Sequence, residues 1–258
     1  MTGNAAQQHD LNPTAAAQVV RHAGLRQGDT VLEVGAGTGA LTAPLLAGGA
    51  TVIAVERDLN RVAKLEKRFA SQIAAGQLIL HAGDVLKLPL ALPATWTVIA
   101  NPPFNLTADL VRAWLLAAKP PHAITLVLQA EAARKLTGAP GMHTRSSALA
   151  ALAGRTGIAA EIPRDATSPP SRVDLALWSF RRHPQAKPAD LVLVDRLLTV
   201  AFAGPHTVQD ALRGIASSIQ LRRQGAENHW QPTAHPREIP PPAWLPLAKL
   251  LHLCGKLP

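Results

Sequence analysis

A short strand that runs directly into a glycine-rich loop constrains the fold of this chain more than any other feature. Residues 30–34 are mostly β-branched or apolar, and the five residues after them are Gly35-Ala36-Gly37-Thr38-Gly39. A helix is expected to begin near Leu41, which completes the order strand, glycine loop, helix. Because glycine has no side chain, a nucleotide-like ligand can come close to this backbone and to the helix N-terminus. The pattern predicts an α/β protein with a Rossmann-like sheet.

A second strand places an acidic residue where such a ligand would carry a ribose. Residues 51–55 are β-branched or apolar and end in Glu56, 17 positions beyond Gly39. A carboxylate at the tip of the second strand can accept hydrogen bonds from both ribose hydroxyls. The loop fits the relaxed dinucleotide pattern Gly-x-Gly-x-x-Ala and equally the Gly-x-Gly-x-Gly of S-adenosylmethionine enzymes. At this point both cofactor classes stay open.

A third strand, at residues 77–81, ends just before Gly83-Asp84-Val85. Asp84 could accept a hydrogen bond from the N6 amino group of the cofactor's adenine, and Val85 could lie against the adenine face. Aspartate after glycine is also a common turn residue or helix N-cap, so the position alone does not decide its role.

The fourth strand leads into Asn101-Pro102-Pro103-Phe104. Two consecutive prolines cannot continue a β-ladder, so the chain must stop and turn there. A carboxamide, two rigid carbonyls and an aromatic ring suit a flat molecule with an amino group, such as adenine. Taken alone, the segment is better explained as a proline-terminated strand with Phe104 in the core. Four such signals at successive strand ends would share the carboxyl edge of one parallel sheet, where α/β ligands bind.

These segments together resemble a known family. The resemblance rests on Val31–Thr42, Val55-Glu56-Arg57-Asp58, Gly83-Asp84-Val85, Asn101-Pro102-Pro103-Phe104 and residues 168–177. They look like the ribosomal RNA adenine-N6 methyltransferases, and within these like the erythromycin-resistance (Erm) type that acts on 23S rRNA. Two departures stand out: Pro102 replaces a usual Ile, Val or Leu, and Gln8-His9-Asp10 replaces Gln-Asn-Phe or Gln-His-Phe.

The resemblance implies an S-adenosylmethionine-dependent methyltransferase that methylates N6 of an adenine in 23S rRNA once or twice, conferring resistance to macrolide-type antibiotics. It implies direct displacement on a base flipped out of its stack, with Asn101, Pro102 and Phe104 as the catalytic residues. The cofactor-binding residues that it implies are His9, Gly35, Ala36, Gly37, Gly39, Glu56, Arg57, Asp84, Val85 and Asn101.

The charge distribution predicts where RNA would bind. The 258-residue chain has a formal charge of +9, which favours a polyanionic partner. Residues 1–180 carry 16 Lys and Arg against 12 Asp and Glu, whereas residues 181–258 carry 10 against 5. We therefore predict a catalytic domain at 1–182 and a smaller, helical, basic RNA-binding domain at 183–258. The predicted RNA contacts are Arg145, Arg181, Arg182, Arg213, Arg222 and Arg223, although a solvated helix face would explain any one of them.

The order of the remaining elements can also be predicted. Strands are expected at 123–129, 158–162 and 174–180, the last two as an antiparallel hairpin. Helices are expected at 14–23, 59–70, 131–136, 148–154, 191–203, 208–219 and 243–253. Loops are expected at 138–147, which holds Arg145, and at the proline-rich, exposed 163–172.

Several classes of protein find no support in the sequence. Cys254 is the only cysteine, which excludes an intramolecular disulfide framework and a multi-cysteine zinc site. No histidine spacing predicts a metal site, and no apolar run or N-terminal pattern predicts a membrane span or secretion. A monomer in the cytoplasm is expected. Three alternatives remain: a 16S rRNA adenine dimethyltransferase of ribosome maturation, a nicotinamide-dependent oxidoreductase, and a binding-only nucleic-acid module.

Overall fold

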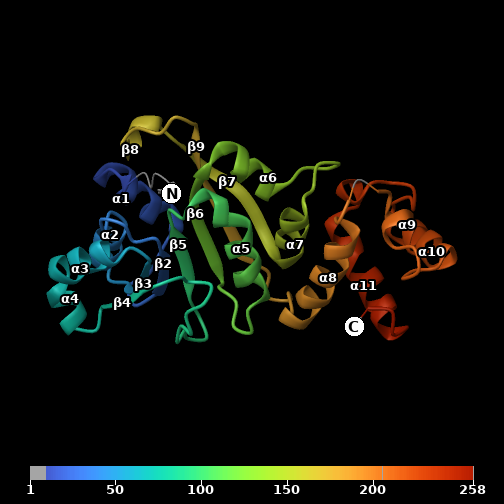
Figure 1. Cartoon of the computed structure of the whole chain (residues 1–258), viewed down its shortest axis with the longest axis horizontal. Coiled ribbons are helices and arrows are strands. Elements are labelled where there is room, and N and C mark those ends of the chain that lie inside the picture. Colours follow the sequence, from blue (N-terminus) through green and yellow to red (C-terminus); the bar gives the residue numbers. More distant parts are fainter. Residues whose placement is uncertain (1–9, 205, 258) are drawn as a thin grey trace, which may run out of the picture. The chain divides into compact units, whose positions relative to one another are not determined.

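Seven strands form the central sheet of the protein, whose computed structural model describes residues 10–204 and 206–257. The strands lie in the order β4-β3-β2-β5-β6-β9-β7 (Figure 1). They comprise β2 (Thr30–Val34), β3 (Thr51–Glu56), β4 (Leu78–Ala82), β5 (Thr97–Ala100), β6 (Ala123–Gln129), β7 (Gly154–Ile162) and β9 (Leu175–Arg182). Neighbours from β4 to β6 pair in parallel, and β9 is antiparallel to β6. The predicted α/β class and Rossmann-like sheet are confirmed.

The strand order reverses at β2. Strands β3 and β4 follow on one side of β2, whereas β5 and β6 lie on its other side. In open parallel sheets, ligands bind outside the carboxyl ends of the strands at such a reversal. The residues that leave β2 and β5 here are Gly35 and Asn101. The topology alone therefore places the glycine loop and the Asn-Pro-Pro segment beside one crevice.

Four helices accompany these strands, and local sequence sets where they begin. They are α1 (Pro13–Ala23), α2 (Thr42–Ala47), α3 (Leu59–Arg68) and α4 (Ala70–Ala74). The Asn12 side chain accepts a hydrogen bond from the Ala15 backbone N–H at 2.9 Å, and Asp58 caps α3 in the same way. These caps satisfy N–H groups that have no partner within the helix. The predicted helix at 59–70 ends at Arg68, and a separate helix begins at Ala70.

A two-stranded sheet joins β1 (Asp10–Leu11) to β8 (Thr167–Ser168). The β8 strand follows the short helix η2 (Arg164–Ala166), and the Asn12 backbone N–H donates to the Ala166 carbonyl at 2.8 Å. Ala166 and Thr167 are buried. The prediction of an exposed loop at 163–172 is therefore wrong for its central part, because its backbone pairs with the segment before α1.

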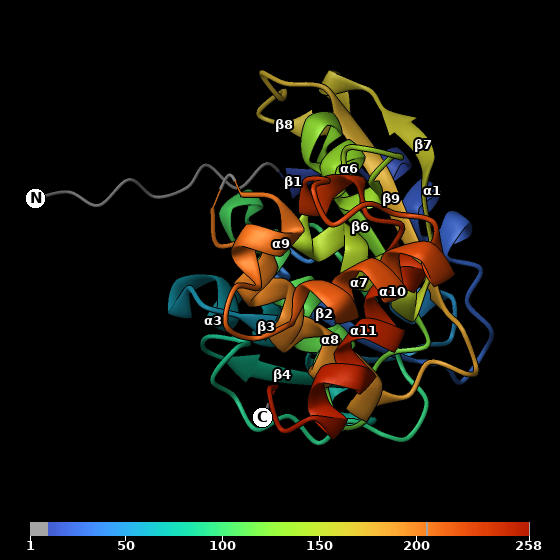
Figure 2. The ribbon, with the colours of Figure 1, turned by 90° about the vertical axis from the view of Figure 1, so that its right-hand side faces the viewer.

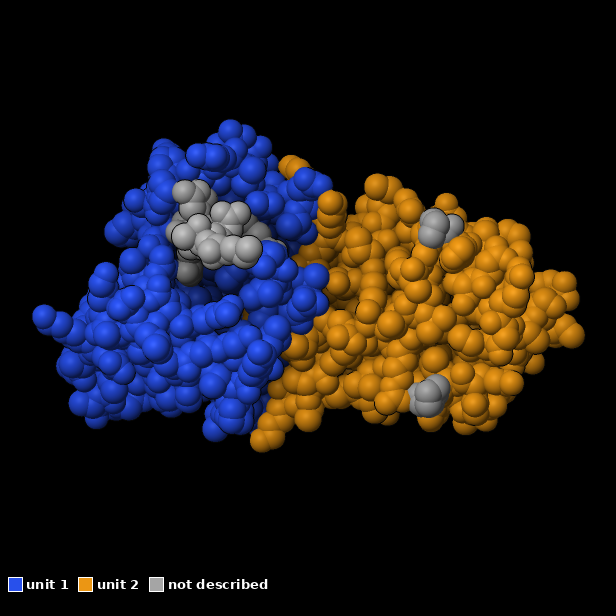
Figure 3. All heavy atoms as spheres, in the orientation of Figure 1, with its two compact units in different colours: residues 1–110, 121–133, 157–181 blue, residues 111–120, 134–156, 182–258 orange. Residues whose placement is uncertain are grey.

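Contacts divide the chain into two compact units (Figure 3). Unit 1 comprises residues 1–110, 121–133 and 157–181, and unit 2 comprises residues 111–120, 134–156 and 182–258. Unit 2 therefore holds the C-terminal region together with two earlier segments. The predicted functional division at 182/183 differs from this partition and stays a prediction.

Helices make up most of unit 2. They are α7 (Arg145–Ala153), α8 (Pro188–Ala201), α9 (Val208–Ala211), α10 (Ser218–Asn228) and α11 (Trp244–Leu253), with the short η3 (Pro236–Glu238) and η4 (Pro241–Ala243). The structure also contains η1 (Phe104–Leu106), α5 (Thr107–Leu116) and α6 (Ala130–Thr137). Helix α8 packs against α7 and α11, and Figures 1 and 2 both show α8 beside α11.

Two predicted boundaries in unit 2 are wrong for identifiable reasons. The expected helix at 208–219 stops at Ala211, because Gly214 has φ 83° and Ser217 caps a new helix with Gln220. The expected loop at 138–147 ends early, because Thr144 and Ser147 form a capping box that starts α7 at Arg145. Both errors are missed capping signals. None of the helices in the described part of the chain has the length and apolar character that a membrane span needs.

Candidate cofactor and adenine site

The loop after β2 requires glycine for its backbone conformation. Gly35, Gly37 and Gly39 have φ values of 73°, 59° and 82°, which side-chain-bearing residues rarely adopt. A Cβ at Gly39 would also lie 2.6 Å from Cε2 of Phe69. The loop therefore packs directly against the end of α3. Its glycines are required by the backbone conformation, whereas the predicted close approach of a ligand stays a prediction.

Glu56 ties the end of β3 to this loop. Its side chain is buried, with 4% exposed. Oε2 accepts a hydrogen bond from the Gly37 backbone N–H at 2.8 Å, and Oε1 accepts one from the Asp58 N–H at 2.9 Å. Each carboxylate oxygen has further lone pairs. The carboxylate is thus held rigidly and can still accept hydrogen bonds from the hydroxyls of a ribose.

Glu33 is a buried acid that sequence reasoning left without a role. It lies on β2 with 1% of its surface exposed, and its Oε2 accepts a hydrogen bond from Thr42 Oγ1 at 2.7 Å. Burial raises the pKa of Glu33 to about 8; the hydrogen bonds from Thr42 oppose this shift, and the nearby charge of Glu56 adds to it. The sequence feature that could have drawn attention to Glu33 is an acidic residue flanked by the apolar residues Leu32 and Val34 within a strand.

One cavity of unit 1 brings the strand ends together. Its lining residues are Asp10, Leu11, Glu33, Gly35, Ala36, Ala40, Leu41 and Asn101. Three of them, Gly35, Ala36 and Asn101, belong to the predicted cofactor site. Buried Glu33, half-buried Asp10 and Asn101 and the glycine backbone suit the cationic amino acid end of S-adenosylmethionine, so these residues fit that part of the cofactor.

The segment after β5 turns as its two prolines require. The β-ladder ends at Ala100, and the Leu106 backbone N–H donates to the Pro103 carbonyl at 3.0 Å as η1 begins. Pro102 is buried, while Asn101 is half-buried at the cavity. The side chain of Phe104, and the whole of His9, lie outside the described residues, so their assigned roles stay predictions.

Asp84 organises a turn beside Glu56. Its Oδ1 accepts a hydrogen bond from the Leu86 N–H at 3.1 Å, and the Gly83 N–H donates to the Glu56 carbonyl at 2.9 Å. The turn role considered from the sequence is therefore present. Asp84 and Val85 are half-buried, whereas Arg57 is exposed. Among the described residues, no hydrogen bond to Oδ2 of Asp84 is seen, so this oxygen can accept one from the cofactor. The predicted contact with adenine is compatible with this geometry.

The predicted RNA-contacting arginines fall into different environments. Arg145 binds Asp195 through Nε and Nη2, at 3.2 and 2.8 Å. Arg182 is half-buried and donates to the Ala186 carbonyl, and burial lowers its pKa. The remaining four are exposed on the surface: Arg181, Arg213, Arg222 and Arg223, of which Arg213 and Arg223 form surface ion pairs with Asp210 and Glu227.

Arg145 also lines a pocket of about 640 Å³ in unit 2, here called the basic pocket. Its lining comprises Lys135, Met142, His143, Thr144, Arg145, Phe202, Gly204, His235 and Arg237. Three of these residues, Lys135, Arg145 and Arg237, have basic side chains and none has an acidic one. Burial lowers the pKa of both histidines. The lining therefore presents net positive charge, which would attract an anion such as a phosphate.

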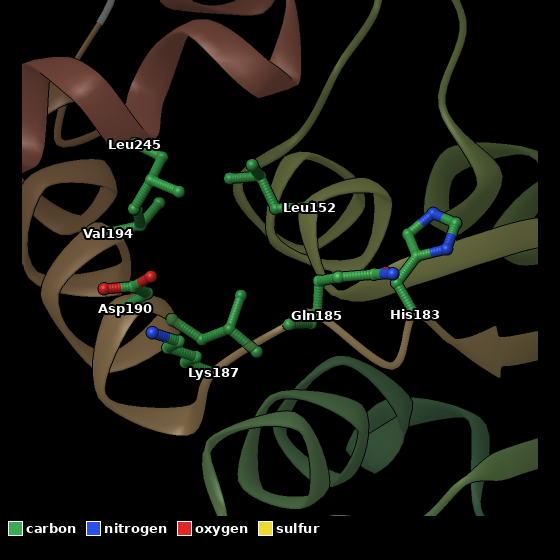
Figure 4. Close-up of a pocket in the computed structure, with 9 residues that line it drawn as sticks. Leu152, His183, Gln185, Lys187, Asp190, Val194 and Leu245 are labelled. Carbon is green, nitrogen blue, oxygen red and sulfur yellow. The ribbon is translucent and has the colours of Figure 1, made fainter.

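A second hollow of unit 2, of about 340 Å³, lies among α7, α8 and α11 (Figure 4). Leu152, Val194 and Leu245 give it apolar walls, and Lys187 and Asp190 stand close together at its side. None of the predicted site residues lines it. Among the described residues, no cluster of three His, Cys, Asp or Glu could hold a metal ion.

Comparison with known sequences identifies close relatives. Residues 4–218 match the family model described as ribosomal RNA adenine dimethylase. The chain is 33% identical over 259 residues to ribosomal RNA small subunit methyltransferase A of Synechococcus sp. strain CC9311, covering 94% of this chain and 92% of that protein. It is 34% identical over 252 residues to the protein of the same name from Jannaschia sp. strain CCS1, covering 94% and 85%.

Solved structures share the fold at lower identity. The 23S rRNA methyltransferase ErmE matches with a TM-score of 0.73 and 23% identity, covering 93% of this chain and 98% of that one. A dimethyladenosine transferase from Plasmodium falciparum matches with a TM-score of 0.73 and 20% identity, covering 95% and 97%. At these identities the likeness shows a common fold and does not distinguish between substrates.

Proposed function

Because the chain belongs to the ribosomal RNA adenine dimethylase family, and is an S-adenosylmethionine-dependent rRNA adenine methyltransferase, we propose that its substrate is an adenine of small-subunit (16S) rRNA, dimethylated at N6. The observation that carries this choice is the 33% identity, over almost the full length of both chains, to a protein named for the small subunit. The nicotinamide-dependent alternative is thereby wrong, and the predicted cofactor is confirmed.

The small-subunit reading takes the place of our Erm-type expectation. The family resemblance is confirmed, whereas the narrower likeness to enzymes that act on 23S rRNA is not. ErmE shares the fold at 23% identity, and at this identity its 23S substrate does not carry over to this chain. Antibiotic resistance is accordingly not part of the proposal. A ribosomal substrate agrees with the expected cytoplasmic location, and the expected monomer stays a prediction.

The chemistry assigned to the chain is orientation of the amino group. Bound S-adenosylmethionine supplies an electrophilic methyl group on its sulfonium. The N6 lone pair of adenine is delocalised into the ring, so hydrogen bonds from N6 to the Asn101 side-chain oxygen and the Pro102 carbonyl would favour a more nucleophilic geometry. Phe104 would stack on the flipped base and stabilise the positive charge that develops on nitrogen.

The protein would hold the cofactor through the residues described above. Glu56, fixed by the Gly37 N–H at 2.8 Å, accepts hydrogen bonds from the ribose hydroxyls. Oδ2 of Asp84 accepts one from the adenine amino group. At Gly35, Gly37 and Gly39, whose φ values favour glycine, no side chain stands between the loop backbone and the cofactor.

RNA phosphates are the ligand that we assign to the basic pocket. Asp195 holds the Arg145 guanidinium through Nε and Nη2, which leaves Nη1 without a recorded partner among the described residues. Such a fixed donor loses little side-chain entropy when it binds a phosphate. Arg237 donates through Nε to His235 Nδ1 at 3.2 Å. This contact restricts the orientation of the guanidinium and so of its two Nη atoms. Arg181, Arg213, Arg222 and Arg223 would add weaker surface attraction.

Primer extension on both rRNAs tests the proposal. RNA from cells lacking the protein is compared with RNA from the same cells carrying the parental gene or the Asn101→Ala gene. We expect a reverse-transcription stop in small-subunit rRNA only with the parental gene, and mass spectrometry of the nucleosides should identify dimethyladenosine. A stop confined to 23S rRNA would replace the proposed substrate. No stop in either rRNA would favour the binding-only alternative.

A further inference from the structure

The cofactor cavity contains a carboxyl group with almost no access to solvent. Glu33 is 1% exposed, less than Asp195 at 3% and Glu56 at 4%. It nevertheless lines the cavity that holds Gly35 and Asn101. A group in this position is close to any ligand that enters, while water stabilises its charge poorly.

The described surroundings of Glu33 offer it donors but no cation. Thr42 of α2 donates from Oγ1 at 2.7 Å. The titratable groups that face it are both acidic: Glu56 of β3, whose charge opposes ionisation, and Asp10 of β1, which lines the same cavity. Asn101, at the end of β5, is neutral. Burial and like charge together keep the pKa of Glu33 near 8, so that about nine-tenths of the molecules carry the proton at pH 7.

The cofactor would reverse this balance, because it brings positive charge. S-adenosylmethionine carries an ammonium group on its amino acid end and a sulfonium beside it. An opposite charge within a few ångströms favours the ionised form of a carboxyl group, and more strongly in a buried site. We propose that binding of the cationic end of S-adenosylmethionine in this cavity expels the proton of Glu33 to solvent, so that cofactor uptake and proton release are one coupled event.

Coupling of this kind must appear in the pH dependence of affinity. If one proton leaves on binding, the affinity for the cofactor rises by nearly tenfold per pH unit while Glu33 is protonated in the free protein. The rise ends above about pH 8, where the free protein has already lost the proton. The inference rests on cofactor binding within the proposed function and does not depend on which rRNA is methylated.

Calorimetry measures the released proton directly. S-adenosylmethionine is titrated into the full chain at pH 7 in buffers of different ionisation enthalpy, and the slope of observed enthalpy against buffer enthalpy counts the protons. We expect a net release of about 0.8 proton at pH 7, because Glu33 loses about 0.9 and the α-amino group of the free cofactor, with an ordinary pKa of about 7.7 to 8.0, takes up about 0.1. The net release should fall and change sign above about pH 8, where Glu33 of the free protein is already ionised and the free cofactor has lost its ammonium proton. Titration with S-adenosylhomocysteine, which lacks the sulfonium charge, assigns the effect: persistence identifies the ammonium as the responsible cation, and loss identifies the sulfonium.

Two variants locate the proton. Glu33→Gln should bind without proton release and with a nearly flat pH dependence from pH 6 to 8. Thr42→Val removes the hydroxyl donor at similar size, so release should persist to higher pH than in the parent. An enthalpy independent of buffer in the parental protein, or unchanged release in folded Glu33→Gln, would overturn the inference. Parental rRNA methylation in the same preparation would then leave the proposed function standing.

Discussion

Glu56 and Gly37 are joined by a hydrogen bond of 2.8 Å, from the backbone N–H of the loop to a carboxylate at the end of the neighbouring strand. The loop follows β2 and the acid ends β3, and these strands pair in parallel with Val34 opposite Val55. The bond therefore fixes the shape of the loop to the position of the carboxylate. The loop and the carboxylate expected to hold the cofactor are thus set in place by one contact.

Replacing Glu56 should reduce cofactor affinity more than it reduces the stability of the fold. For Glu56→Ala we expect S-adenosylmethionine affinity to fall by about 1.5 to 3 kcal/mol, the scale of hydrogen bonds to a charged group. Glu56→Gln keeps the side-chain size and should lose less. Calorimetry and thermal melting on both variants give the answer. An unchanged affinity in folded Glu56→Ala would remove Glu56 from the ribose site.

Glu33 should make stability fall as pH rises. Its pKa in the folded protein is about 8, above its ordinary value of 4.5, so the folded state binds the proton more tightly than the unfolded chain. The stabilisation is complete below pH 4.5 and is lost between pH 4.5 and 8, at up to about 1.4 kcal/mol per pH unit. The free energy of unfolding of the parent, minus that of Glu33→Gln, should fall across this window in urea titrations. A constant difference would contradict the assignment.

Asp195 should contribute strongly to the stability of unit 2. It is 3% exposed and accepts hydrogen bonds from both Arg112 and Arg145. Asp195→Ala would leave two arginines without their carboxylate, a change that costs about 3–5 kcal/mol for fully buried pairs. Because both arginine side chains are partly exposed, we expect about 2 to 3 kcal/mol. Denaturant unfolding measures this loss, with Asp165→Ala on an exposed site as the control.

The sequence was sufficient for the parts of the fold that depend on local pattern. The strands at 30–34 and 123–129 have the predicted bounds, because β-branched and apolar residues make up most of each strand. The sequence could not predict that Asp10 would pair with Ser168, a contact 158 positions apart. Nor could it show that Asp195 engages Arg145, which was assigned to RNA alone. Glu33 was overlooked because its pKa depends on burial, and burial is a property of the assembled cavity.

The basic pocket gives a prediction for RNA affinity. Lys135→Ala and Arg237→Gln should each weaken binding to small-subunit rRNA and reduce the slope of log affinity against log salt by about 0.7 to 0.9, the value for one phosphate contact. Filter binding at salt concentrations between about 50 and 200 mM measures these slopes. Arg155→Ala, an exposed residue outside the pocket lining, is the matched control. Equal slopes in all four proteins would exclude the pocket from the interface.

Asn101 separates chemistry from binding. It is half-buried at the cavity shared with Gly35 and Glu33, and we assign its side-chain oxygen to the adenine amino group during methyl transfer. Asn101→Ala should therefore slow single-turnover methylation by about 100-fold or more, the cost of losing one such stabilising contact, while RNA affinity changes little. Asn101→Asp keeps an acceptor at the same place and should retain more activity than the alanine variant.

A purely structural role for this segment predicts a different outcome. Asn101→Ala would then lower the melting temperature and reduce turnover only in proportion to the folded fraction. Phe104→Leu extends the comparison, because loss of stacking on a base is worth about 1 to 3 kcal/mol, whereas Phe104→Tyr keeps the ring and should keep most activity. Thermal stability and single-turnover rates measured on the same preparations distinguish the two accounts. Parental methylation by Asn101→Ala would show that the proposed orientation of N6 is wrong, even with the cofactor site intact.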